Sequence, residues 1–214
     1  MKRVLDKNQD KAEQVRSRLR DKSIRMYNFI SSPGAGKTTL LEHTLEQLGH
    51  TFRIGIIEGD IATDRDAQRL KRFNNPIVLI NTDGGCHLDS NSIDKALDAF
   101  NLDDMDVLFV ENVGNLVCPS HFDLGETAKI ALVSTSEGDD KPIKYPMLFR
   151  DAKAVVLNKM DILEYTNFNY ARFVKDLREV NPNVPLMEIS CTLNTGLEEW
   201  VKWLIHEIEV RSNR

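Results

Sequence analysis

The sequence has few cysteines and no long apolar run. Its three cysteines are Cys86, Cys118 and Cys191. They are too few, and odd in number, for a disulfide framework, so we expect free thiols in a reducing compartment. The apolar runs fall far short of the roughly 20 residues that span a bilayer, and charges stand near the N-terminus where a secretory signal has its apolar stretch. These absences predict a cytoplasmic protein with no membrane partner.

The sequence also lacks an excess of charge of one sign. It has 28 Lys and Arg against 33 Asp and Glu, a net charge of −5 without a dominant block. Proteins that bind nucleic acid through its phosphates need a basic surface, so we expect no nucleic-acid partner. With 214 residues, 41% of them hydrophobic, the chain can form the core of one α/β domain with small additions.

Short β-rich apolar runs alternate with helical patterns from Arg25 onward. Continuous apolar strands separated by helices predict a mainly parallel sheet with helices on both faces. The segment from Ser134 to Pro146, with its glycine and two prolines, is expected to be a long loop. Strands are expected at residues 26–30, 52–57, 77–80, 107–110, 130–133, 155–157 and 186–189.

A charged segment precedes the first of these strands. Within residues 4–21, Ala12, Val15 and Leu19 form a thin apolar stripe at helical spacing. This pattern predicts a helix that docks through one face and is solvated on the other. We therefore divide the chain into a helical docking segment, residues 1–23, and a nucleotide-binding domain with an embedded metal site, residues 24–214.

The segment Ser31–Thr38, which reads SSPGAGKT, is typical of a phosphate-binding loop. Backbone N–H groups would converge on the phosphates, Lys37 would reach the β and γ oxygens, and the Thr38 hydroxyl would ligate Mg²⁺. Ser31 stands where the pattern has its first glycine, so the first turn requires permissive backbone angles. The loop predicts a nucleoside triphosphate ligand, held by Gly34, Ala35, Gly36, Lys37, Thr38 and Thr39.

The segment NKMD, residues 158–161, predicts that the base is guanine. The Asp161 carboxylate can accept hydrogen bonds from guanine N1–H and the 2-amino group, a pair of donors that adenine lacks. Asn158 would either support the loop or meet the N7 edge, and the aliphatic stem of Lys159 can cover the ring. A second base-contacting loop is expected at Ser190 and Cys191, where Cys191 is read as a structural thiol.

Acidic groups are needed to complete a magnesium site, because phosphates and one hydroxyl do not fill an octahedron. The candidates Asp60, Asp66 and Glu111 follow strands, at the edge of the sheet where ligands bind. Gly114 lies in the segment after Glu111, which would respond to the γ-phosphate. No Gln stands where Ras-like enzymes orient the attacking water, so we expect slow GTP hydrolysis.

Two further segments carry residue types that ligate metals. TDGGCH brings Cys86 and His87, and ENVGNLVCP brings Cys118 seven residues after Glu111. A lone cysteine is more often a small buried hydrophobe, but together these groups, or two copies at a twofold axis, could supply soft and borderline ligands. His121 is a weaker candidate. The spacing predicts a mechanical link between nucleotide state and thiol position.

The motifs GGCHLD and ENVGNLVCP closely resemble those of HypB, the GTPase family that helps insert nickel during [NiFe]-hydrogenase maturation. The resemblance covers about residues 24–205 and implies a SIMIBI-type P-loop GTPase that binds GTP, GDP and Mg²⁺. It further implies a Ni²⁺ and Zn²⁺ site at Cys86, His87 and Cys118, and a homodimer linked to GTP and metal. The implied partners are a HypA-type metallochaperone and a hydrogenase large-subunit precursor. The chain carries neither the Cys-rich motif nor the His-rich tract of some members, so we expect no separate terminal nickel site or storage role.

The sequence leaves three alternative functions open. A urease-maturation GTPase of the UreG type would carry a Cys-Pro-His motif, which Ser120 interrupts here, and would leave Cys86 and His87 unexplained. A P-loop phosphotransferase would have a substrate pocket and usually no guanine motif. A metal scaffold with a vestigial nucleotide fold is disfavoured by Lys37, Thr38 and Asp161.

Overall fold

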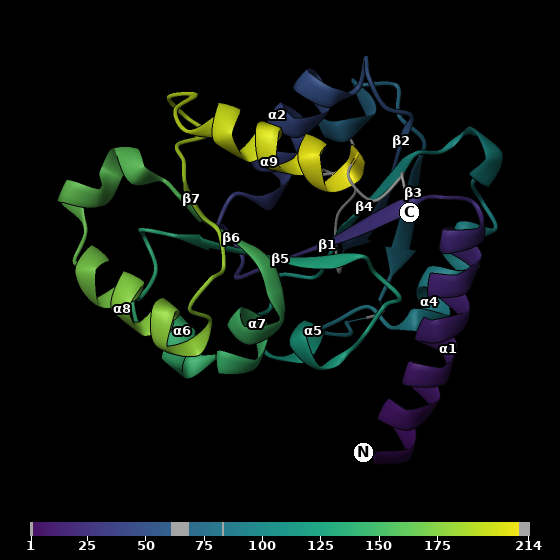
Figure 1. The fold of residues 1–214 in the computed structure, drawn as a ribbon, viewed down its shortest axis with the longest axis horizontal. Coiled ribbons are helices and arrows are strands. Elements are labelled where there is room, and N and C mark those ends of the chain that lie inside the picture. Colours follow the sequence, from purple (N-terminus) through teal and green to yellow (C-terminus); the bar gives the residue numbers. More distant parts are fainter. Residues whose placement is uncertain (1, 61–68, 83, 210–214) are drawn as a thin grey trace.

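The computed structural model describes residues 2–60, 69–82 and 84–209, which form a seven-stranded parallel sheet flanked by helices (Figure 1). The strand order is β3-β2-β4-β1-β5-β6-β7. The strands are β1 (Arg25–Ser31), β2 (Ile54–Asp60), β3 (Ile77–Asn81), β4 (Val107–Glu111), β5 (Ala128–Ser134), β6 (Ala152–Asn158) and β7 (Leu186–Glu188). All seven predicted strands are confirmed, with ends shifted by a few residues.

Helices cover both faces of the sheet, as the continuous apolar strands predicted. The α-helices are α1 (Lys2–Asp21), α2 (Lys37–Leu48), α4 (Ser90–Leu97), α5 (Cys118–His121), α6 (Lys141–Lys144), α7 (Pro146–Asp151), α8 (Tyr170–Val180) and α9 (Leu197–Glu209). Two 3₁₀ turns, η1 (Leu102–Asp104) and η2 (Met160–Tyr165), complete the described elements.

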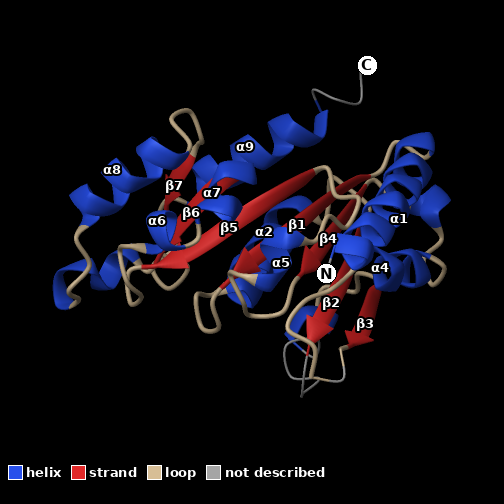
Figure 2. Cartoon of the chain, turned by 90° about the horizontal axis from the view of Figure 1, so that it is seen from below, coloured by secondary structure: helices blue, strands red, loops and turns tan. Residues whose placement is uncertain are grey.

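Alternate residues of the central strand β1 enter different parts of the core. Tyr27 and Phe29 pack into the cluster that holds the apolar side chains of α2 and α9. Met26 points to the opposite face, into the cluster formed with α1 and α4, and Ile30 joins the cluster of α7 and α8. Figure 2 shows α1 and α4 together over one half of the sheet. Burial on both faces is typical of a central strand in a parallel sheet.

Helix α1 packs on α4 through the stripe that the sequence predicted. Ala12, Val15 and Leu19 are buried, and the last two belong to the same core cluster as the apolar face of α4. Ion pairs lie beside this apolar contact: Lys11 pairs with Asp94 at 2.6 Å and Arg18 with Asp98 at 2.8 Å. The division of the chain into residues 1–23 and 24–214 stays a prediction.

One expectation about the connections was wrong in part. The segment from Ser134 to Pro146 contains the short helix α6 and leads directly into α7, instead of forming one long loop. Pro142 and Pro146 lie in the first turns of these helices, where the missing N–H of proline costs no hydrogen bond. Among the described residues, no helix is long and apolar enough to cross a membrane.

Candidate nucleotide and metal sites

The phosphate-binding loop joins β1 to α2. Ser31 is the last residue of β1 and pairs with Leu132 of β5, so it lies in extended backbone that needs no glycine. The left-handed turns fall on Gly34, with φ 76°, and on Gly36, with φ 101°. A Cβ atom on Gly36 would lie 2.4 Å from Asn158 Nδ2. Glycine is therefore required where the loop turns, and serine is tolerated at the first position of the motif.

The loop opens into a cavity of about 530 Å³ at the N-terminus of α2. Lys37 Nζ donates to Ser31 Oγ at 3.0 Å, and Thr38 Oγ1 donates to Glu111 Oε1 at 2.8 Å. A helix N-terminus, a lysine and a hydroxyl facing one cavity form an arrangement suited to a polyphosphate. The cavity is lined by Pro33, Gly34, Gly36, Lys37, Thr38, Thr39, Glu58, Gly59, Arg69, Glu111, Asn112, Gly114 and Lys159.

Two charged lining residues were missed from the sequence. Glu58 is buried in β2 and lies opposite Glu111 in the β2–β4 register. Glu58 follows an apolar run just as Glu111 does, so an acidic residue at the end of a predicted strand was a signal that could have identified it. Arg69 reaches Thr39 Oγ1 at 3.1 Å and Glu42 at 2.5 Å. No local motif singles out Arg69, because the fold alone brings it to the cavity.

The structure gives less information on the two other acidic residues predicted for the magnesium site. Asp60 ends β2 at the carboxyl edge of the sheet, opposite Asn81 of β3. Asp66 lies outside the described residues. Buried carboxylates beside the Thr38 hydroxyl form an oxygen donor set that fits Mg²⁺, and Glu111 with Glu58 would supply it.

The segment after Glu111 lies against the phosphate-binding loop. A Cβ atom on Gly114 would come within 2.9 Å of Pro33 Cγ, so a larger residue would push the two segments apart. Gly114 also lines the nucleotide cavity. This close approach holds the start of the segment that leads to Cys118 against the phosphate-binding loop.

The candidate base site is built from three loops that meet at Asn158. Its Nδ2 donates to Ala35 O at 2.9 Å, and its Oδ1 accepts from the backbone N–H of Lys159 and of Cys191. Both ends of the Asn158 amide are thus hydrogen-bonded to main-chain groups. This geometry favours a role in supporting the loop over contact with the N7 edge of guanine. Ser190 Oγ donates to Asp161 Oδ1 at 2.5 Å.

The other members of this site have distinct surroundings. Lys159 has left-handed backbone, with φ 63°, and its Nζ donates to Ser136 Oγ at 3.2 Å. Cys191 is buried, and burial raises the pKa of its thiol to about 11. A thiol with so high a pKa stays protonated near neutral pH, consistent with the structural role expected of it.

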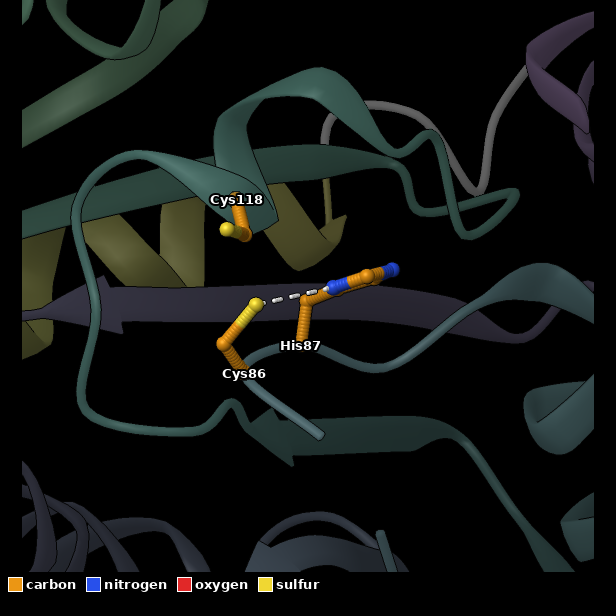
Figure 3. Close-up of side chains that lie close together, drawn as sticks. All are labelled: Cys86, His87 and Cys118. Atoms are coloured by element: carbon orange, nitrogen blue, oxygen red, sulfur yellow. Dashed lines mark hydrogen bonds between the residues drawn. The ribbon is translucent and has the colours of Figure 1, made fainter. Parts of the chain in front are cut away.

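Cys86, His87 and Cys118 form the candidate metal site (Figure 3). One ligand atom from each residue lies within 4.8 Å of the other two, although Cys118 begins α5 and the other two follow β3. Cys86 Sγ and His87 Nδ1 are 3.5 Å apart. Two sulfurs and an imidazole nitrogen suit Zn²⁺ and Ni²⁺. Among the described residues, His121 at the end of α5 is not part of this cluster.

The surroundings of the cluster set the protonation and orientation of its ligands. A hydrogen bond with Cys118, together with burial, raises the pKa of the Cys86 thiol, so this thiol stays protonated near neutral pH in the absence of metal. Burial lowers the pKa of His87, which keeps its imidazole neutral and able to ligate. The ring of His87 stacks on Phe122, with centroids 3.8 Å apart. Stacking fixes the ring plane beside the two thiols.

Residues 26–188 match the family model of the CobW/HypB/UreG nucleotide-binding domain. The hydrogenase maturation factor HypB of Escherichia coli (strain K12) is 46% identical over 201 residues, covering 94% of this chain and 69% of that protein. The chain belongs to the HypB family of hydrogenase maturation factors. The hydrogenase/urease maturation factor HypB of Helicobacter pylori (strain J99) is 37% identical, covering 97% of this chain and 86% of that protein.

Solved HypB structures share the whole fold. HypB from Archaeoglobus fulgidus superposes with a TM-score of 0.89 at 35% identity, covering 95% of this chain and 100% of that one. HypB from Helicobacter pylori, solved in complex with nickel, gives 0.89 at 37% identity, covering 97% and 96%. An LAO/AO transport system kinase, with a TM-score of 0.59 at 17% identity, shares the fold alone.

Proposed function

We propose that this chain is a GTP-hydrolysing metallochaperone that binds nickel, and zinc, and assists nickel insertion into [NiFe]-hydrogenase. One observation carries the proposal. Three ligand atoms from two separate segments lie within 4.8 Å of one another, and the Cys118 segment starts at Glu111, which is bonded to the phosphate-binding loop. The nickel complex of the Helicobacter pylori relative supports the choice of cargo.

The nucleotide half of the proposal follows from the loop residues. The N–H groups of Gly34, Ala35 and Gly36 bind the phosphates, and Lys37 neutralises the β and γ oxygens. Asp161, oriented by Ser190, accepts the donors of the guanine edge. Thr38 and Glu111 would hold Mg²⁺, which when bound offsets the charge of the phosphates.

Hydrolysis would be slow. A water attacks the γ-phosphorus, the bond to the β–γ bridging oxygen breaks, and GDP with phosphate leaves. Ras-like enzymes orient this water with a glutamine side chain, and Gly114 has no side chain that could do so. Arg69, a charged residue, does line the same cavity. Asp66 remains a candidate for the Mg²⁺ neighbourhood. Turnover of many GTP molecules per second without a partner would contradict this part of the proposal.

The metal half of the proposal uses Cys86, His87 and Cys118 as ligands to the cargo ion. A thiol must lose its proton to ligate the ion, and the pKa of Cys86 is raised, so uptake is accompanied by proton release. Three protein ligands leave a position that a second copy of the chain, a HypA-type metallochaperone or the hydrogenase large-subunit precursor could fill during transfer. We propose a homodimer linked to GTP and metal on this basis.

A UreG-type reading fits the site less well, because it leaves Cys86 and His87 without a role beside Cys118. The name of the Helicobacter pylori relative includes urease, so a urease precursor is a second candidate recipient. Apo-hydrogenase and apo-urease precursors offered to the nickel-loaded chain would separate the two. Nickel transfer to the hydrogenase precursor is the expected result.

Equilibrium dialysis tests the function directly. The chain should bind GTP and one nickel per site, and a Cys86→Ser, His87→Ala, Cys118→Ser variant should lose the metal while still binding GTP. Selective binding of ATP, or unchanged nickel stoichiometry in the triple variant, would overturn the proposal.

A further inference from the structure

A series of hydrogen-bonded polar side chains crosses the core and connects the end of β4, the strand β1 and the start of β5. Asn112 Nδ2 donates to Asn28 Oδ1 at 3.1 Å, and Asn28 Nδ2 donates to Glu126 Oε1 at 3.3 Å. Lys129 Nζ lies 3.9 Å from the same carboxylate oxygen. Asn28, Asn112 and Glu126 are buried, and 12% of the Lys129 side chain is exposed. We call Asn28, Asn112, Glu126 and Lys129 the core polar network.

The two ends of the network hold the two segments that carry the candidate metal ligands. At one end, Asn112 Oδ1 accepts from the N–H of Leu88, the residue after His87, at 3.3 Å. At the other end, Lys129 Nζ donates to the carbonyl of Ser120, two residues after Cys118, at 3.0 Å. The network therefore joins the His87 segment to the Cys118 helix without passing through the ligands themselves.

The network also begins at the candidate nucleotide cavity, which Asn112 lines. Asn112 directly follows Glu111, which accepts the hydrogen bond of Thr38. The main chain from Glu111 can carry a displacement to Cys118, but Cys86 and His87 belong to another segment. The bond from the Leu88 N–H to Asn112 gives that segment its own connection to the strand that meets the phosphate-binding loop.

The hydrogen bonds fix one another's direction. Glu126 accepts from the Leu124 N–H at 2.6 Å as well as from Asn28, so the Asn28 amide must point its nitrogen toward the carboxylate. Its oxygen then faces Asn112, whose own oxygen is turned to Leu88 and Val113. Burial raises the pKa of Glu126, and the charge of Lys129 opposes that rise. A buried network of this kind has one satisfied arrangement, because any unpaired member costs free energy.

We propose that the core polar network is a positioning device for the metal site, which holds both ligand-bearing segments at one spacing and moves them together when Glu111 responds to the nucleotide. This inference rests on the proposed function, since it assigns the nucleotide control of that same site. Asn28, Glu126 and Lys129 are not among the candidate metal ligands or the residues that line the nucleotide cavity, and they act through the segments they hold. Neighbours of metal ligands that orient them in other proteins change affinity by about 10- to 100-fold when replaced.

Two substitutions test the proposal from different ends. Lys129→Met keeps the aliphatic stem and removes the donor to Ser120, and Asn28→Leu keeps the volume and breaks the centre of the network. Lys129→Arg restores a cation that reaches both partners. Lys153→Met, a matched change at an exposed position of the neighbouring strand β6, is the control. Nickel affinity is measured by competition with a chromophoric chelator, once in the presence of GDP and once in the presence of a non-hydrolysable GTP analogue.

We expect Lys129→Met and Asn28→Leu to weaken nickel binding about tenfold or more and to reduce its nucleotide dependence. GTP affinity without metal should stay near that of the wild type, whereas Lys129→Met should lower the thermal transition, because the Ser120 carbonyl and Glu126 lose a partner. Lys129→Arg and Lys153→Met should keep wild-type nickel affinity, and the thiolate-to-nickel absorption should change in Lys129→Met alone of the three lysine variants.

The outcomes separate this inference from the proposed function. A wild-type chain that binds no nickel would overturn the proposed function. A wild-type chain that binds nickel, with Lys129→Met behaving like Lys153→Met in both nucleotide states, would overturn the positioning role alone. If Asn28→Leu does not fold, the Lys129→Met and Lys129→Arg pair decides the question.

Discussion

The hydroxyl of Thr38 donates to the carboxylate of Glu111 across 2.8 Å, joining the start of α2 to the end of β4. Both groups face the cavity expected to hold the nucleotide, so GTP with Mg²⁺ would exchange this bond for new ones. Glu111 leads to Cys118 through the main chain and to the Leu88 N–H through Asn112. We therefore expect nucleotide state to reach the proposed metal site first through Thr38 and Glu111.

The lysine of the loop gives the first prediction. Lys37→Ala removes the ammonium group that would neutralise the β and γ oxygens, and we expect it to abolish most nucleotide binding. Fluorescence titration with a labelled GTP analogue measures the effect. A Lys37→Ala chain with wild-type GTP affinity would show that the cavity at α2 is not the nucleotide site.

Base recognition gives the second prediction. Asp161→Asn exchanges one carboxylate acceptor for an amide donor, so affinity for GTP should fall about tenfold or more, since hydrogen bonds to charged groups contribute about 1.5–3 kcal/mol. Affinity for xanthosine triphosphate should rise, because its 2-oxo group accepts where guanine donates. Ser190→Ala, which removes the hydrogen bond that orients Asp161, should weaken GTP binding less. Unchanged selectivity in Asp161→Asn would show that this loop does not contact the base.

The attachment of α1 gives a pH-dependent prediction. Burial alone would raise the pKa of Asp123, but hydrogen bonds from Arg16 and the Gly125 N–H outweigh it and lower the pKa below its ordinary 3.8. A carboxylate whose pKa falls on folding stabilises the native state above the unfolded value, and this contribution disappears as pH falls through the folded value. Asp123→Asn should therefore lower the free energy of unfolding at pH 7 by about 1 kcal/mol.

Urea unfolding at pH 7 and near pH 3 measures this effect, with Asp103→Asn, an exposed aspartate paired with Lys22, as the control. The difference between wild type and Asp123→Asn should shrink at the lower pH. A difference that is the same at both pH values would contradict the role of the Arg16 pair.

Thiol chemistry gives the fourth prediction. Burial raises the pKa of Cys191 to about 11, so a maleimide at pH 7 should leave Cys191 unmodified in the folded chain. Cys86 and Cys118 are partly exposed and should react, and nickel should protect them both. Mass spectrometry of the peptides reads this out. Labelling of Cys191 before the other two would contradict the assignment.

Local patterns were enough to predict the sheet and much of the candidate sites. Buried strands such as β1 and β4 are apolar on both faces, and the loop and base motifs are short segments whose residue order carries their chemistry. The pairing of Cys118 with Cys86 and His87 rested on resemblance, because residues about 30 positions apart meet only through the strand order β3, β2, β4. Arg69 and the core polar network could not be predicted, since Asn28, Asn112 and Glu126 come together through strand register.

The central claim is that nucleotide state controls the metal site through the segment from Glu111 to Cys118. The direct test measures nickel affinity of wild type and Cys118→Ala in GDP and in a non-hydrolysable GTP analogue. We predict that the wild-type affinity differs about tenfold between the two states, a coupling of about 1.4 kcal/mol. Cys118→Ala should bind nickel more weakly, equally in both states, and keep its metal-free GTP affinity. Wild-type nickel affinity in Cys118→Ala, in both nucleotide states, would contradict the account.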